Sequence, residues 1–295
     1  MSKVKTRYTE LACIDAAFSE YGCSNVVCRN KEQESLYKFW RDYRSDMGML
    51  RDILHGYFGT TDEINKIIAG YGLDLHVPGA SELAPPTGAG LRAAAGILDY
   101  AADWDYSEKE TVIVGGASYK AVKLRGLLGY YKLLGGRIVT ILKIRLTSAD
   151  SLYLTTDIEP CPYDKTVLQF MIGAVPISTF PCYIVVPETT LHVYGDIGWL
   201  VGMQVDSSRE IVVDWAGQES LISINVKGIV AKSVTAARFF SGCIEMIDYE
   251  NIIYVVDKPY NIWIQREGIH DTVISASVTM EDWVNEECST EGYSL

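Results

Sequence analysis

The chain lacks several features that would assign a class of function at once. It has no Cys-x-x-Cys pair among its seven cysteines, and its four histidines stand apart without metal-ligand spacing. These absences argue against a zinc ribbon, a redox pair and a histidine-based metal site. No Gly-x-Ser-x-Gly turn is present to hold a nucleophile, so a serine hydrolase is not indicated. The sequence therefore predicts a protein that is not an enzyme and binds no cofactor or metal.

Long apolar runs and an excess of basic residues are also missing. No stretch of about eighteen apolar residues occurs, so no membrane span is expected. The opening residues MSKVKTRYTE contain no apolar core, which argues against a secretory signal. The formal net charge of -12 disfavours binding to nucleic acid, because phosphate contacts require Lys and Arg. Together with cysteines in no disulfide-like pattern, these features predict an intracellular protein.

The first third of the sequence has the periodicity of helices. Apolar residues recur at three- and four-residue steps and predict a helix over 31–56. Thr60 and Glu63 have the spacing of a capping box at the start of a second, short helix. An Ala-rich stretch, 91–104, predicts a third helix. The division expected from these patterns is a helical region, 1–85, followed by a β-rich region.

A β-α-β unit is expected over 111–146. Its parts are a strand at 111–114, a Gly-Gly turn, a helix over 119–134 and a strand over 137–146. Such an order suits two parallel strands joined by a right-handed crossover. The turn segment GGASYKAVKLRG has neither a dinucleotide fingerprint nor a Gly-Lys-Ser/Thr ending, so it predicts a structural turn and not a phosphate site.

Beyond residue 150, short β-prone runs alternate with turn residues. They lie at 166–172, 181–186, 199–205, 210–214, 221–226, 251–256, 260–265 and 272–278. The β-rich region is expected to extend over 86–280, followed by an acidic tail at 281–295 that has five acidic residues and no Lys or Arg. The predicted fold class is α+β, with a helical N-terminal third, one β-α-β unit and a mostly antiparallel β-rich C-terminal half.

Charge is unevenly distributed along the chain. Residues 110–146 hold seven Lys or Arg and one acidic residue, whereas residues 147–295 hold seven Lys or Arg and twenty-one acidic residues. A basic segment of this kind is either a solvated surface or a dock for an acidic protein partner. Tyrosine, with nineteen copies, adds side chains suited to interfaces. The candidate interface residues are Lys120, Lys123, Arg125, Tyr130, Tyr131, Lys132 and Arg137.

Five stretches, in order, resemble parts of the serpin family. They are TTDEINKIIAGYGLDL (60–75), TVIVGGASYKA (111–121), VLQFMIGAVPISTFPCYIVVPE (167–188), INVKGIVAKSVTAA (224–237) and VVDKPYNIWIQREG (255–268). The third is similar to a serpin strand pair that ends in Leu-Pro-acid, which here reads Val186-Pro187-Glu188. The fourth looks like the strand and hinge that precede the serpin reactive loop. The resemblance implies a protease-binding loop at about 235–252.

The same stretch departs from the serpin pattern. Lys227 stands where the family has Glu, and the run of small residues is interrupted by Lys232 and Arg238, then by Phe239 and Phe240. Insertion of a loop into a sheet buries alternate residues, so a charge on the inward side would oppose it. Inhibition of a protease by loop insertion is therefore not expected from the sequence.

Three hypotheses follow for function. The first is a non-enzymatic structural or assembly protein that acts through interfaces with other protein subunits, such as a viral capsid or capsid-associated subunit located in the virion. The alternative is a serpin-like protease-binding protein. The third is an enzyme with a site built on the 111–146 unit.

Overall fold

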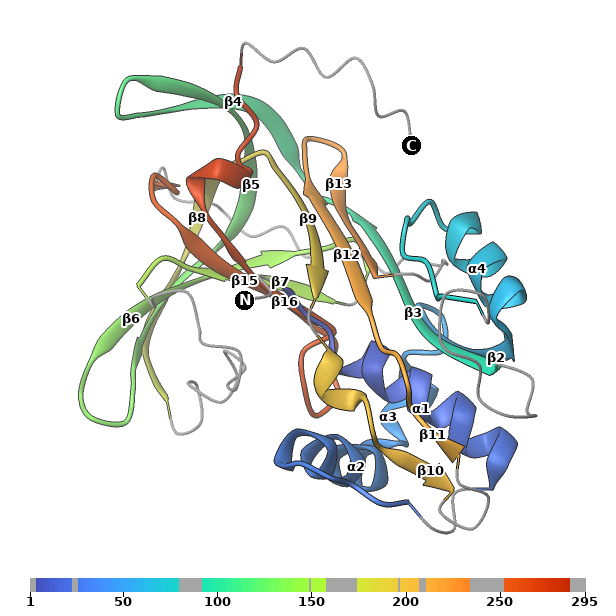
Figure 1. Cartoon of the computed structure of the whole chain (residues 1–295). Coiled ribbons are helices and arrows are strands. Elements are labelled where there is room, and N and C mark those ends of the chain that lie inside the picture. The colour runs from blue at the N-terminus through green and yellow to red at the C-terminus, as the bar shows by residue number, and fades with distance from the viewer. Residues whose placement is uncertain are drawn as a thin grey trace.

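The computed structural model describes residues 4–22, 26–79, 92–148, 150–157, 174–195, 197–206, 211–233 and 252–286. Within these ranges the chain forms two large β-sheets that face each other, with helices gathered at one end (Figure 1). None of the helices in the described ranges has the length and apolar character needed to span a bilayer.

The larger sheet has nine strands. Its order is β1 (Val4–Lys5), β16 (Ile274–Val278), β15 (Tyr260–Gln265), β7 (Ser151–Thr155), β6 (Ile138–Arg145), β5 (Ala117–Lys132), β8 (Val175–Pro187) and β14 (Ile253–Val255), with β4 (Ser107–Val114) paired to β5. Strand β14 pairs with β8 in parallel, and the other pairs are antiparallel. The sheet is therefore mixed.

The smaller sheet has five strands. Its order is β2 (Leu54–Thr60), β3 (Arg92–Asp103), β13 (Gly228–Ser233), β12 (Gln218–Ile224) and β9 (Thr189–Gly195). Strands β10 (Gln204–Asp206) and β11 (Ile211–Val212) form a separate pair. In Figure 1 the hairpin of β12 and β13 lies between β9 and β3. Strand β13 is thus an internal strand with a neighbour on each side.

Four α-helices and two short 3-10 helices complete the described structure. They are α1 (Arg7–Tyr21), α2 (Lys31–Tyr43), α3 (Asp46–Met49), α4 (Thr61–Gly70), η1 (Gly198–Leu200) and η3 (Met280–Asp282). Helix α1 packs against β2 and β3 so closely that a Cβ at Gly96 would overlap the carbonyl oxygen of Thr9. Helix α4 packs on the opposite face, where Ile64 and Ile68 meet Ala93. One helix thus packs on each face of the β2–β3 part of the sheet.

The main hydrophobic core fills the space between the two sheets. Leu124 and Ile184 come from the larger sheet, and Leu98 and Ile222 from the smaller one; all four are almost fully buried. Their burial removes apolar surface from water and is the main stabilising contribution to the stacking.

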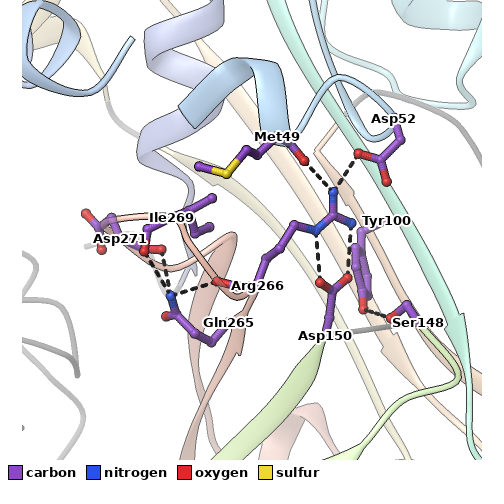
Figure 2. Close-up of polar contacts among 9 residues, drawn as sticks. All are labelled: Met49, Asp52, Tyr100, Ser148, Asp150, Gln265, Arg266, Ile269 and Asp271. Atoms are coloured by element: carbon purple, nitrogen blue, oxygen red, sulfur yellow. Dashed lines mark hydrogen bonds and ion pairs between the residues drawn. The ribbon is translucent and has the colours of Figure 1, made fainter. Parts of the chain in front are cut away.

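An ion-pair network centred on Arg266 joins β15 and β7 of the larger sheet to the turn that precedes β2 of the smaller sheet (Figure 2). Arg266, at the end of β15, donates two parallel hydrogen bonds to Asp150, at 2.9 and 3.1 Å. Its third nitrogen contacts Asp52 at 2.5 Å and the carbonyl oxygen of Met49 at 2.9 Å. The Asp150 side chain is only 1% exposed. Such a fork-shaped pair fixes orientation as well as distance.

The predicted helical N-terminal third is wrong. Helix 31–56 is broken into α2 and α3 and is followed by β2, and the helix expected over 91–104 is strand β3. The alanines of this segment provide small side chains where α1 and α4 press on the two faces of β3, so tertiary packing overrides helix propensity. The capping box of Thr60 and Glu63 at the start of α4 is confirmed.

The predicted β-α-β unit is also wrong. The Gly115-Gly116 turn joins β4 to β5 in an antiparallel hairpin, with both glycines at positive φ. The helix expected over 119–134 is instead the long strand β5, whose inward residues Val122, Leu124 and Leu128 alternate with residues on the other face. An alternation of two is the period of a strand.

Candidate strand-insertion site

The turn between β12 and β13 is held by three side chains from two other parts of the chain. Its ends bond reciprocally, from Asn225 N to Gly228 O at 3.1 Å and from Gly228 N to Asn225 O at 3.2 Å. Trp104 donates to Asn225 O at 2.8 Å, and Ser107 donates to Val226 O at 2.8 Å. The amide of Val226 in turn donates to the carboxylate of Glu188, at 3.2 Å. The acid of the Val186-Pro187-Glu188 motif thus positions this turn.

All six residues of β13 pair with residues of β3. Ile229 and Ala231 point inward and are completely buried. Val230 and Lys232 lie on the opposite face and are partly buried. A Cβ at Gly228 would overlap the carbonyl oxygen of Ala102 on β3, so only glycine fits where the strand enters.

One of the charges expected to oppose insertion, Lys232, does not lie on the inward face of the sheet. Lys232 lies on the outward face, directly opposite Asp99 in the ladder between β13 and β3. Burial raises the pKa of Asp99, and the positive charges of Lys232 and His55 act in the opposite direction. The lysine is therefore compensated by a carboxylate on the neighbouring strand.

The described ladders of β13 cover only part of its two longer neighbours, β3 and β12. Strand β3 pairs with β2 from Arg92 onward, but among the described residues its ladder with β13 begins only at Leu98. On the other side, β12 pairs with β9 from Gln218, while its ladder with β13 begins at Leu221.

Two cavities lie beside the N-terminal half of β3 and the chain that leads into β12. One, of about 80 Å³, is lined by residues of β3, including Gly96, and by Gly217 and Gln218 next to it on the β12 side. The other, of about 170 Å³, continues past Arg92 and is lined by α1, β3 and residues 211–217. We call these two cavities, together with the stretch of β3 that lines both, the slot.

The floor of the slot is formed by α1. Cys13 donates from its thiol to the carbonyl oxygen of Ala94 at 3.4 Å, and burial raises the pKa of this thiol to about 11. Glu10 also lines the smaller cavity. Burial raises the pKa of its carboxyl to about 7, against the opposing effect of Lys5 and Arg7. The Cys13 thiol is therefore neutral near pH 7, whereas the Glu10 carboxyl changes its charge in that range.

The roof of the slot is the segment that follows α4. Glu219, on β12, accepts hydrogen bonds from the amides of Asp74 and Leu75 at 2.8 and 2.6 Å, and contacts His192 Nε2 at 2.6 Å. Leu75 and Val77 line the cavities from this side. The buried Glu219 thus ties the covering segment to the sheet.

The candidate interface residues lie elsewhere, along β5 and the turn after it. Lys123 pairs with Glu108 at 3.1 Å and lies over the ring of Tyr183. Arg125 lies over the ring of Tyr106 at 4.3 Å. Lys120 is partly buried beside the described part of the acidic tail, and its amide donates to Val284 O at 2.9 Å.

The remaining candidates lie toward the other end of β5. Tyr131 packs with Val139 and Ile141, whereas Tyr130 is exposed. Lys132 and Arg137 are exposed near the turn. A helix would have gathered these residues on one side, but a strand spreads Lys120 and Lys132 roughly 40 Å apart. Their role as an interface stays a prediction.

Comparisons with known proteins identify the fold. No protein-family model and no curated protein matches the chain. Among solved structures, a cleaved, loop-inserted ovalbumin is similar with a TM-score of 0.56 and 9% identity, over 92% of each chain. Protease nexin-1 with heparin gives 0.48 and 11%, over 92% of this chain and 97% of that one. Thyroxine-binding globulin with thyroxine gives 0.47 and 8%, over 93% and 91%.

The predicted resemblance to serpins is therefore confirmed at the level of the fold. The expectation of a structural, assembly or capsid protein in a virion is wrong, because the fold is that of serpins over 92% of the chain. The 111–146 unit on which the enzyme hypothesis depended is a set of antiparallel strands. Within the described ranges, no group of three or more His, Cys, Asp or Glu is arranged to hold a metal ion.

Sequence reasoning missed most of the slot. It identified 224–237 through the family resemblance, but it predicted a helix for the residues of β3 that border the slot. It gave no role to Trp104 or Gly96. The signal that was available is the run Ala93-Ala94-Ala95-Gly96. Such a run of small residues is compatible with a helix, but it also suits a strand against which a helix packs closely.

Proposed function

We propose that this chain is a serpin-like protein that binds a protease through residues 235–252 and takes the cut segment into the slot. The observation that supports this proposal is β13, which lies as an internal strand between β3 and β12 and whose last described residue lies next to the stretch of β3 that lines the smaller cavity. The segment expected to bind the protease, 235–252, lies outside the described residues except for its last residue. Addition of a loop as a strand to a sheet is a known mode of recognition, in which backbone hydrogen bonds supply affinity.

The expected chemistry belongs to the protease. Its Ser or Cys attacks a carbonyl carbon within 235–252, the peptide C–N bond breaks, and the new amino terminus leaves with the proton. If the upstream segment enters the slot before water attacks the ester or thioester, the two proteins stay covalently joined. If water attacks first, the chain is released as a cut product.

The test is incubation with a panel of serine and cysteine proteases. We expect a complex that survives SDS, or a single cut in 235–252 followed by a rise in melting temperature. Absence of both a complex and a cut in this window across the panel refutes the proposal.

Two matched variants separate binding from insertion. Ala231→Arg places a charge on the inward, fully buried face of β13 and should abolish the complex and the rise in melting temperature. Val230→Arg places the same charge on the outward face and should retain both. Equal behaviour of the two variants contradicts insertion along the β13 path.

A further inference from the structure

One face of helix α1 lines both cavities of the slot. Glu10 borders the smaller cavity, Cys13 borders both, and Ala17 and Tyr21 border the larger one. Residues spaced three or four apart lie on the same side of a helix. A helix rises about 1.5 Å per residue, so Glu10 and Ala17 lie about 10 Å apart along its axis. The two cavities therefore follow one another along α1 and share part of their wall.

The larger cavity suits an aromatic ring. Its volume is about 170 Å³, and an apolar cavity of about 150 Å³ accepts benzene. Aromatic side chains from three parts of the chain line it: Tyr21 of α1, Phe58 of β2 and Trp215 before β12. Such side chains favour contact with another ring. The exposed residues Arg92 and Asp214 also border this cavity, which places its opening at the protein surface.

The smaller cavity suits a positive charge. Two acidic residues line it, Glu10 and Glu219, and no Lys, Arg or His is among its described lining residues. Glu219 is already bonded, because its carboxylate accepts from two amides of the roof and contacts His192. The Glu10 carboxyl, in contrast, has no hydrogen bond or ion pair within the described ranges. Glu10 is therefore the group available to a ligand.

The surroundings of Glu10 decide when it carries a negative charge. Burial raises its pKa to about 7, while Lys5 and Arg7 act to lower that pKa and Asp271 acts to raise it. Arg7 is itself paired with Asp271 at 3.7 Å. Cys13, the next residue on this face of α1, is neutral near pH 7. A cation beside Glu10 thus meets a carboxylate without a partner once the pH exceeds about 7.

We infer that the slot binds a small aromatic amine, with its ring in the larger cavity and its ammonium group at the carboxylate of Glu10. A chain of two or three carbons joins the ring and the ammonium past Cys13, where the two cavities share their wall. A neutral molecule of the same shape lacks the ion pair, and an aliphatic amine leaves the larger cavity unfilled. This inference goes beyond the proposed function, because it concerns the uncut chain and requires no protease.

The experiment is calorimetric titration of the full, uncut chain with phenethylamine. Phenethyl alcohol keeps the ring without the charge, and ethylamine keeps the charge without the ring. We expect phenethylamine to bind at least about tenfold more tightly than either, from the typical contribution of a hydrogen bond to a charged group and of a buried ring. Absence of binding by phenethylamine, or equal binding of phenethylamine and phenethyl alcohol, overturns the inference.

Glu10→Gln and Glu20→Gln form a matched pair of variants. Both replace a carboxylate of α1 by an amide, but Glu20 is exposed and lines neither cavity. In the parent, the affinity for phenethylamine should rise about tenfold from about pH 6 to about pH 8, because Glu10 ionises while the alkylammonium stays charged. Glu20→Gln should keep this rise, and Glu10→Gln should lose it. Equal pH profiles of the two variants overturn the inference.

Ala17→Leu tests the position of the ring. Its larger side chain takes up part of the larger cavity, so phenethylamine should bind about tenfold more weakly while ethylamine is little affected. The melting temperature without ligand reports whether this variant folds, and the Glu10 pair decides the question where it does not. A folded Ala17→Leu that binds phenethylamine as tightly as the parent overturns the inference. The proposed function is tested separately, by the protease panel.

Discussion

Gly228 offers the sharpest test of how β13 is held in the sheet. Replacement by alanine adds a single methyl group, which would overlap the carbonyl oxygen of Ala102 and lie 3.2 Å from the Cα of Asp103. Both contacts are with the backbone of β3, so no side chain can move aside to relieve them. Either β3 and β13 separate locally, or the start of β13 leaves the sheet.

The cost can be bounded from what β13 buries. Full burial of Ile229 contributes about 2 kcal/mol and that of the Ala231 methyl about 0.8 kcal/mol. If β13 left the sheet, the lost burial of these two side chains would lower the free energy of unfolding by about 3 kcal/mol. If β13 stayed in place, overpacking would lower it by about 1–3 kcal/mol. We expect Gly228→Ala to lower the free energy of unfolding by about 1–3 kcal/mol.

Urea unfolding measures the loss, and hydrogen exchange locates it. The amides of β13 should exchange faster in the variant, while those of β15 should be unchanged. The matched control is Gly70→Ala, where a Cβ would meet nothing within 4 Å; it should be neutral. A Gly228→Ala variant as stable and as protected as the parent would refute the placement of β13 beside β3.

Three further predictions concern charges. Arg266→Ala should lower the free energy of unfolding in urea by about 3–5 kcal/mol, because it leaves the buried Asp150 without its ion-pair partner. The double variant Arg266→Met with Asp150→Leu should recover most of this loss. A loss below about 1 kcal/mol in Arg266→Ala would contradict this account. Glu10 has a folded pKa of about 7, above its unfolded value, so stability should fall as the pH rises from about 4.5 to about 7. Glu10→Gln should flatten that dependence, and an unchanged pH profile would be inconsistent with the raised pKa of Glu10. Lys232→Glu should lower stability by about 1 kcal/mol at neutral pH and less in acid, where Asp99 is protonated; equal losses at both pH values would disprove the pairing.

The sequence by itself determined features that depend on neighbours along the chain. The capping box of Thr60 and Glu63 and the tight turn at Gly115-Gly116 follow from the residues at those positions, because a cap and a turn close within a few residues. The relation to serpins could also be seen in 224–237 and in Val186-Pro187-Glu188, whose acid holds the turn before β13.

Only the tertiary structure decided what depends on distant partners. The Ala-rich segment of β3 suits a helix in isolation, and it is a strand because β2 and β13 pair with its edges and α1 packs on Gly96. The sequence likewise presents Lys232 as an obstacle to insertion, but the side of the sheet on which a charge lies depends on strand register. The slot, with Glu10 on its floor and Glu219 at its roof, exists only because segments more than a hundred residues apart meet around one gap.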